Sequence, residues 1–266
     1  MLFLFLRYTW ITNSSFFDVV KEGFQTLTIP KSGSYSFEVI GAGMPFKGHK
    51  KEESGARIVG KIRLERGDKI TVALGQKYKG NYVSGCGGTF VVRECGNRPE
   101  PLFVAAGAGH KNSDLVYGRA SLAETAKGNE KIGSSGIQAF QNDEKEDFFC
   151  GGAGFLEPPQ VGKLHDQSQP PQTYFQGLMG GKGYDFEDKC SLEGGFGGGG
   201  ASIFRILNGQ FKHYYGCGGG YTGGSSLIRS DDICDGGGGG SFAADPDATF
   251  DYQFEDYGKC KIKFLN

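Results

Sequence analysis

The amino-acid sequence predicts a mainly β protein, an antiparallel β-sandwich that carries a long glycine-rich insertion. Segments of alternating apolar and polar residues follow one another from residue 24 to residue 106, as expected of strands with one buried face. The end of the chain alternates in the same way, so the chain returns to the sheets there. Between these parts glycine gathers in runs, and the whole chain contains 47 glycines among 266 residues, well above the usual share of about 7%.

The predicted organisation is a short lead segment followed by one domain with an insertion. The lead segment is 1–23 and the domain is 24–266. Sandwich strands are assigned to 24–106 and 257–266, and the glycine-rich insertion to 107–256.

Six strands are predicted in the first part of the sandwich. Pro30 stops the first, because proline cannot donate to a strand ladder, and Gly67 provides the turn before the fourth. The fifth and sixth are expected to pair with each other through a long connection. In chain order the strands are Phe24–Pro30, Tyr35–Ile40, Gly55–Leu64, Lys69–Leu74, Cys86–Val92 and Pro101–Ala106.

A hairpin is predicted inside the insertion, and a closing strand after it. Ser202–Leu207 and Gln210–Tyr215 flank the dipeptide Asn208-Gly209, which is the strongest short-range signal for a two-residue hairpin turn. The closing strand, Gly258–Leu265, places on one face the residues Cys260, Ile262 and Phe264.

The stretch Gly194–Gly240 contains three glycine runs, and two interpretations of them are open. Glycine disfavours strand and helix interiors, because it loses the most backbone freedom on ordering. The runs are either flexible linkers, as Gly/Ser-rich segments usually are, or polyproline-II-type segments that pack side by side. Apolar side chains threaded through the stretch favour the ordered form: Phe196, Ile203, Phe204, Ile206, Leu207, Phe211, Tyr214, Tyr215 and Tyr221.

Charge and motifs exclude several function classes. The formal net charge of −1 gives no reason to expect a nucleic-acid partner. No apolar run reaches the roughly 18 residues of a membrane-spanning helix. The glycine runs match neither the P-loop nor the dinucleotide-binding pattern, and nucleophile-elbow, D-F-G and H-R-D motifs are absent. We therefore expect no enzymatic activity and no cofactor.

Seven cysteines, an odd number, leave two interpretations open: disulfide bonds in an oxidising compartment, or buried thiols. No C-x-x-C pair occurs and no cysteine–histidine spacing fits a zinc site, so no metal is predicted. Several of the cysteines lie beside glycine runs, where a bond would tie segments that have no side chains to hold them. The disulfide candidates, with no pairing assigned, are Cys86, Cys95, Cys150, Cys190, Cys217, Cys234 and Cys260.

The start of the chain carries one modification signal and no clear signal peptide. Met1–Leu6 is apolar, but Arg7 ends the run before it reaches the length of about 7–15 residues that a secretory signal needs. A truncated gene model would explain such a start. Asn13 opens the one N-x-S/T triplet, which predicts glycosylation in an extracellular chain.

The motifs occur together in an order that resembles one known family. In sequence they are SGSYSFEVIGAG, GARIVGKIRLERGDKITVALGQ, CGGTFVV, PLFVAAGAG, GGFGGGGAS, GCGGGYTGGSS, GGGGGSF and GKCKIKFL. This order is similar to that of the glycine-rich domain in the ectodomains of anaplastic lymphoma kinase and leukocyte tyrosine kinase receptors. The resemblance covers Phe24–Leu265. The chain departs from it at Ser202–Tyr215, where an apolar hairpin stands in place of further glycine.

The resemblance implies a fold, a location and a ligand class. It implies a tumour-necrosis-factor-like sandwich with an inserted lobe of packed polyglycine helices, in an extracellular, disulfide-permissive place. In those receptors the region binds small basic helical cytokines, partly through acidic side chains, and ligand binding dimerises the receptor. The late part of this chain is acidic, with neither lysine nor arginine between Arg229 and Lys259. The residues predicted to take the equivalent ligand-binding role are Asp245, Asp247, Asp251, Glu255 and Asp256.

Two hypotheses of function follow. The first is a ligand-binding module of a receptor-kinase-like protein of the plasma membrane, with a basic protein as ligand and a homodimer formed on binding. The second is a secreted or surface structural or adhesive protein, in which the glycine lobe is a rigid spacer.

Overall fold

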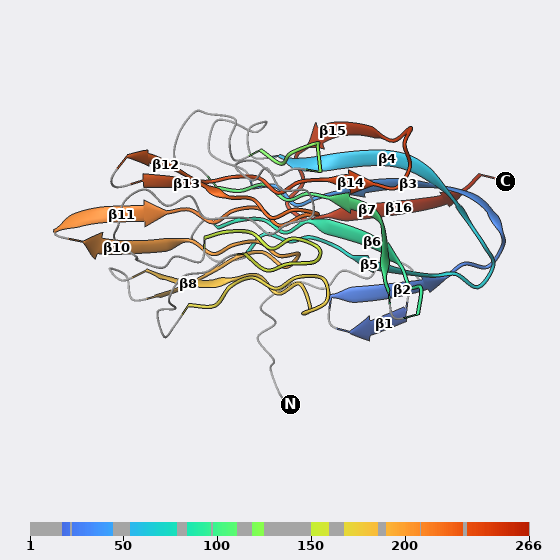
Figure 1. The fold of residues 1–266 in the computed structure, drawn as a ribbon, viewed down its shortest axis with the longest axis horizontal. Helices are drawn as coiled ribbons and strands as arrows, with labels where there is room; N and C mark the ends of the chain where they lie inside the picture. The colour runs from blue at the N-terminus through green and yellow to red at the C-terminus, as the bar shows by residue number, and fades with distance from the viewer. Residues whose placement is uncertain are drawn as a thin grey trace.

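A computed structural model shows sixteen strands in three sheets and no helix within the residues that it describes (Figure 1). Two sheets lie toward one end of the long axis and the third lies at the other end, with non-repetitive backbone between them. The described residues are 18–21, 23–44, 54–78, 84–96, 98–110, 119–124, 150–159, 168–185, 190–207, 209–230 and 233–265.

The first two sheets, here called sheets A and B, are antiparallel throughout. Sheet A consists, in spatial order, of β1 (Asp18–Lys21), β2 (Phe24–Thr28), β5 (Lys69–Ala73), β6 (Thr89–Arg93), β7 (Glu100–Ala105) and β14 (Phe242–Ala243). Sheet B consists of β15 (Thr249–Gln253), β4 (Gly55–Leu64), β3 (Gly33–Ile40) and β16 (Lys259–Phe264).

Sheets A and B enclose one hydrophobic core. Alternate side chains of β3 and β4, such as Phe37 and Ile58, are fully buried there against Ile70 and Phe103 of sheet A. The rings of Phe37 and Phe103 meet across the two sheets at 5.1 Å between centroids. Period-two alternation therefore produces a sandwich, because every second side chain of each strand points to the same face.

The second face of sheet A is also buried. Phe90 and Val104, which point away from sheet B, pack in a separate cluster with Phe155, Tyr174 and Phe196 from the glycine-rich part. Burial on both faces explains why β6 and β7 are almost continuously apolar. In contrast, β16 alternates lysines with partly buried apolar residues, because only one of its faces contacts the core.

The third sheet, sheet C, contains the predicted hairpin. Its strands β10 (Ile203–Leu207) and β11 (Gln210–Tyr214) pair in antiparallel register around Gly209, whose φ of 78° suits a residue without Cβ. Parallel neighbours flank the hairpin on both sides. The spatial order is β12 (Ser226–Ser230), β13 (Ile233–Gly236), β11 (Gln210–Tyr214), β10 (Ile203–Leu207), β8 (Lys182–Asp185) and β9 (Cys190–Glu193).

Buried glycine segments fill the space between the sandwich and sheet C. Their amides bond to carbonyls of other segments: Gly218 to Gly237 at 2.9 Å, Gly107 to Gly219 at 2.9 Å, and Gly239 to Gly107 at 3.1 Å. These bonds satisfy the backbone N–H and C=O groups of the buried segments, which would otherwise lack hydrogen-bond partners. We call this set of segments the glycine body and define it as residues 85–88, 107–109, 150–154, 194–200, 216–220 and 237–240.

Close backbone approach is the reason for glycine in this body. A Cβ built on Gly218 would overlap the carbonyl oxygen of Gly107 and would lie 2.8 Å from the nitrogen of Gly239. Most glycines of the body meet backbone in the same way. The segments therefore pack at a distance that a side chain would prevent.

The mainly β prediction is confirmed, and sheets A and B are antiparallel as expected. The six early strands, the hairpin and the closing strand all form near their predicted ranges. However, β1 lies inside the predicted lead segment and pairs with β2. Likewise β14 and β15 lie inside the predicted insertion, 107–256, and pair with β7 and β4. Short or half-buried edge strands leave a weaker sequence pattern than central ones.

Candidate ligand-binding surface

Three of the five predicted acidic residues lie along the β15 edge of sheet B, and the other two lie in the connection that leads to β16 at the opposite edge. Asp245 and Asp247 lie in the turn between β14 and β15, and Asp251 lies within β15. Glu255 and Asp256 lie in the connection from β15 to β16. The structure thus divides the five residues between the β15 edge and the connection to β16, and gives them different partners.

Asp245 holds the turn before β15. Its carboxylate accepts hydrogen bonds from the backbone nitrogen of Lys61 at 2.6 Å and from that of Asp247 at 3.0 Å. The Lys61 amide lies just beyond the residues of β4 that pair with β15. Asp245 therefore satisfies a strand-edge donor and fixes the turn, which is a structural role.

Glu255 and Asp256 form ion pairs within the chain. A carboxylate oxygen of Glu255 lies 2.7 Å from the ammonium of Lys259, and one of Asp256 lies 2.8 Å from that of Lys77. Gln253 also donates to Glu255 at 3.1 Å. A basic ligand at this point would compete with lysines already in place.

Asp247 and Asp251 are the two members of this set that are exposed over the whole residue; the Asp256 side chain is 43% exposed but is paired with Lys77. Asp251 accepts from the backbone nitrogen of Tyr252 at 2.7 Å, which orients its carboxylate, and its register partner on β4 is Arg57. Of the five predicted ligand-binding residues, these two are the ones placed to meet a partner at the outer edge of the sheet.

A row of alternating charges continues from this edge across the outer face of sheet B. Glu38 on β3 accepts from Lys261 at 2.8 Å and from the Arg57 guanidinium at 2.7 Å. The hydrogen bonds from Lys261 and Arg57 lower the pKa of Glu38. The row positions Arg57 beside Asp251, so it also sets the charge at the inner side of the candidate surface.

This row of charged side chains was not predicted from the sequence. Lys261 and Glu38 are 223 residues apart and meet because β16 pairs with β3. The alternating lysines of the closing strand indicate a charged outer face. They do not identify the strand that pairs with it.

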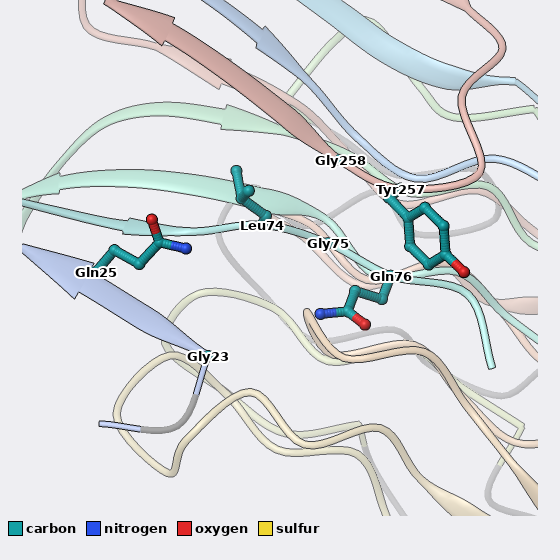
Figure 2. A pocket seen from close by; sticks show the side chains of 7 residues that line it. All are labelled: Gly23, Gln25, Leu74, Gly75, Gln76, Tyr257 and Gly258. Atoms are coloured by element: carbon teal, nitrogen blue, oxygen red, sulfur yellow. The ribbon is translucent and has the colours of Figure 1, made fainter. Parts of the chain in front are cut away.

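A small hollow lies where the start of β2, the segment after β5 and the segment before β16 meet (Figure 2). Its volume of about 10 Å³ is close to the space of one water molecule. Small-molecule sites usually measure about 300–1,000 Å³, so the hollow does not suit a ligand of that kind. Its lining consists of Gly23, Gln25, Leu74, Gly75, Gln76, Tyr257 and Gly258.

The disulfide prediction is wrong for the five cysteines whose side chains are described. Cys86, Cys95, Cys150, Cys217 and Cys260 carry thiols. The sulfur atoms of two of them face oxygen atoms: Cys217 lies 3.5 Å from the Ser226 hydroxyl, and Cys150 donates to the Tyr214 carbonyl at 3.6 Å. Burial raises the pKa of the Cys217 thiol to about 11.

Three predicted sites lie outside the described residues: the side chains of Cys190 and Cys234, and Asn13. Among the side chains that are described, no three of His, Cys, Asp or Glu gather closely enough to hold a metal ion. The same described part of the chain contains no helix long and apolar enough to cross a membrane.

Comparisons with known proteins add no assignment. No protein-family model matches the chain, and no curated protein matches it either.

Proposed function

We propose that this chain is an extracellular ligand-binding module, comparable to the glycine-rich domain of anaplastic lymphoma kinase and leukocyte tyrosine kinase receptors. In this proposal it acts in transmembrane receptor signalling at the plasma membrane and has no catalytic activity of its own. The observation that carries the proposal is the pair of exposed carboxylates, Asp247 and Asp251, on the edge of a sheet that packs on a closed core.

The finer fold assignment belongs to the same proposal. Sheets A and B would form a tumour-necrosis-factor-like sandwich, and the glycine body would run as packed polyproline-II-type helices. In support, the glycine body lies outside regular strands and its amides bond to neighbouring segments, as a polyproline II segment requires, since it has no internal hydrogen bonds. Gly197 and Gly198 depart from this geometry with φ of 102° and 80°.

A basic protein is the ligand class that suits the surface. An exposed acidic edge steers a cationic partner and favours the correct orientation on encounter. The proposed homodimer would form on ligand binding. The extracellular location draws no support from disulfides, because the five described cysteines carry thiols.

The experiment that tests the proposal compares ligand affinity between charge variants. The partner is first captured by crosslinking on native cell surfaces and then purified. We expect Asp247→Lys/Asp251→Lys to raise the Kd at least about tenfold, since opposite charges at an interface edge become like charges. Glu157→Lys is the matched control, because Glu157 is exposed on another segment, and it should leave the Kd unchanged. Equal affinity of the double variant and wild type would refute this surface.

The structural or adhesive alternative makes a different prediction. A rigid spacer would self-associate or remain in a matrix without one specific ligand. Sedimentation of the purified chain over a range of concentrations separates the two, because the ligand-binding module alone should stay monomeric.

A further inference from the structure

The β10–β11 hairpin projects beyond its neighbours in sheet C (Figure 1). Within the described residues, β10 pairs with β8 at Phe204, and β11 pairs with β13 at His213 and Tyr214. The outer part of the hairpin, from Arg205 to Lys212, is therefore a two-stranded ribbon. Such a ribbon is only marginally stable in water unless something covers its apolar face.

One face of this ribbon is apolar at the tip and aromatic toward the base. Ile206 and Phe211 are register partners, so their side chains share a face, and they are 51% and 49% exposed. The next pair on that face is Phe204 and His213, whose rings lie 5.0 Å apart. Tyr215, buried at the base, contacts both rings. The apolar row thus starts in the body and ends in solvent.

The hairpin is also cationic. No aspartate or glutamate occurs in the sequence between Glu193 and Asp231. Lys212 is the register partner of Arg205, and because this pair is adjacent to the Ile206–Phe211 pair it lies on the opposite face of the ribbon. Asp185, which pairs with Phe204 at the base of the hairpin, is buried. A tip with a half-exposed apolar pair on one face and Lys212 on the other complements a surface that is apolar inside and anionic outside.

We propose that the tip of this hairpin docks on the surface of an anionic lipid bilayer. Ile206 and Phe211 enter the boundary between headgroups and acyl chains, as the apolar face of an interfacial element does. Lys212 lies at the level of the anionic headgroups, where each cation strengthens binding. The inference rests on the hairpin alone and is independent of the acidic edge of sheet B.

The size of the exposed apolar area favours a bilayer over a protein partner. A stable protein interface buries about 800 Å² on each side and involves about 20–30 residues. The projecting tip offers two half-exposed apolar side chains, and their area falls well short of that. A fluid bilayer needs no complementary shape, so a narrow tip is sufficient.

Vesicle sedimentation of the full chain tests the proposal, with phosphatidylcholine vesicles that contain or lack phosphatidylserine. We expect wild type to bind the anionic vesicles more tightly, and added salt to weaken that binding. Ile206→Ser/Phe211→Ser should lower the partition coefficient at least about tenfold, because most of the inserted apolar area is lost. Lys212→Gln should lower it about fivefold on anionic vesicles alone.

The control removes a similar apolar pair elsewhere. Leu156 and Phe175 are 56% and 53% exposed, and Phe175 packs on Phe155 in the cluster on the second face of sheet A. Leu156→Ser/Phe175→Ser should keep full vesicle binding. Near-ultraviolet circular dichroism and the Tm establish that each variant is folded.

Three results would overturn the proposal. The first is no sedimentation of the wild-type chain with anionic vesicles. The second is equal binding by wild type and the Ile206→Ser/Phe211→Ser variant. The third is a dimer in vesicle-free solution that this variant abolishes, together with no vesicle binding, since the hairpin face would then belong to contacts between copies of the chain.

Discussion

Adding a single methyl group at Gly218 tests whether the glycine body is a packed structure. The Cβ of Gly218→Ala would lie 2.8 Å from both the carbonyl carbon of Gly107 and the nitrogen of Gly239, and would overlap the Gly107 carbonyl oxygen. All of these are backbone atoms, so no flexible side chain can move aside. Three glycine segments must separate to admit the methyl group.

The expected loss follows from two costs. Overpacking a close-packed interior costs about 1–3 kcal/mol. Separating the segments also weakens buried bonds such as the one from Gly218 to Gly237, and leaving one such group unsatisfied costs about 1–3 kcal/mol. Together they predict a loss of about 2–6 kcal/mol in the free energy of unfolding, a large share of the roughly 5–15 kcal/mol of a typical domain. Flexible linkers predict no loss.

Urea unfolding followed by circular dichroism measures this difference. Gly67→Asn is the control, because the turn glycine Gly67 has a φ of 95° and no atom within 4 Å of an added Cβ. Its expected cost is about 1 kcal/mol or less, since asparagine tolerates this backbone region. A free energy of unfolding for Gly218→Ala within about 0.5 kcal/mol of wild type, at an unchanged m value, would refute the packed glycine body.

Three further predictions concern the sandwich and the thiols. Phe103→Ala, which empties the contact between sheets A and B, should lower the free energy of unfolding by about 3–5 kcal/mol in urea titration; a loss below about 1 kcal/mol would contradict the shared core. The pKa of Glu38 is lowered in the folded state by the Lys261 hydrogen bond first, so its stabilisation is fully present above its ordinary pKa of 4.5 and is lost as pH falls through the folded value. Glu38→Gln should therefore flatten the acid side of the pH–stability curve, and curves of the same shape would argue against the ion-pair row. Cys95 is exposed and should react with a thiol reagent in the native protein, whereas buried Cys217, with its pKa raised to about 11, should react after unfolding; mass spectrometry that finds either in a disulfide would contradict the thiol assignment.

Local patterns made most of the strands predictable. Gly55–Leu64 forms as expected because its alternate side chains face the core between the sheets. The hairpin forms around Gly209 because the turn chemistry and the flanking apolar segments agree. These features depend on neighbours in sequence, which is why reading the chain alone identifies them.

Long-range partners were not predictable. The acidic segment was expected to be a binding surface, yet Asp245 is occupied by the Lys61 amide and Asp256 by Lys77. Both contacts depend on how segments far apart in sequence come together. The composition of one strand does not determine its pairing register with another strand. The same holds for thiols such as Cys217, because proximity to a glycine run does not place two sulfur atoms within bonding distance.

Amide hydrogen exchange in the intact protein tests the central claim most directly. If the glycine body is hydrogen-bonded and buried, the amides of 194–200, 216–220 and 237–240 will be protected to the same degree as those of β6 in the sandwich. Exchange of these amides at the rates of an unfolded peptide, while β6 stays protected, would contradict the account.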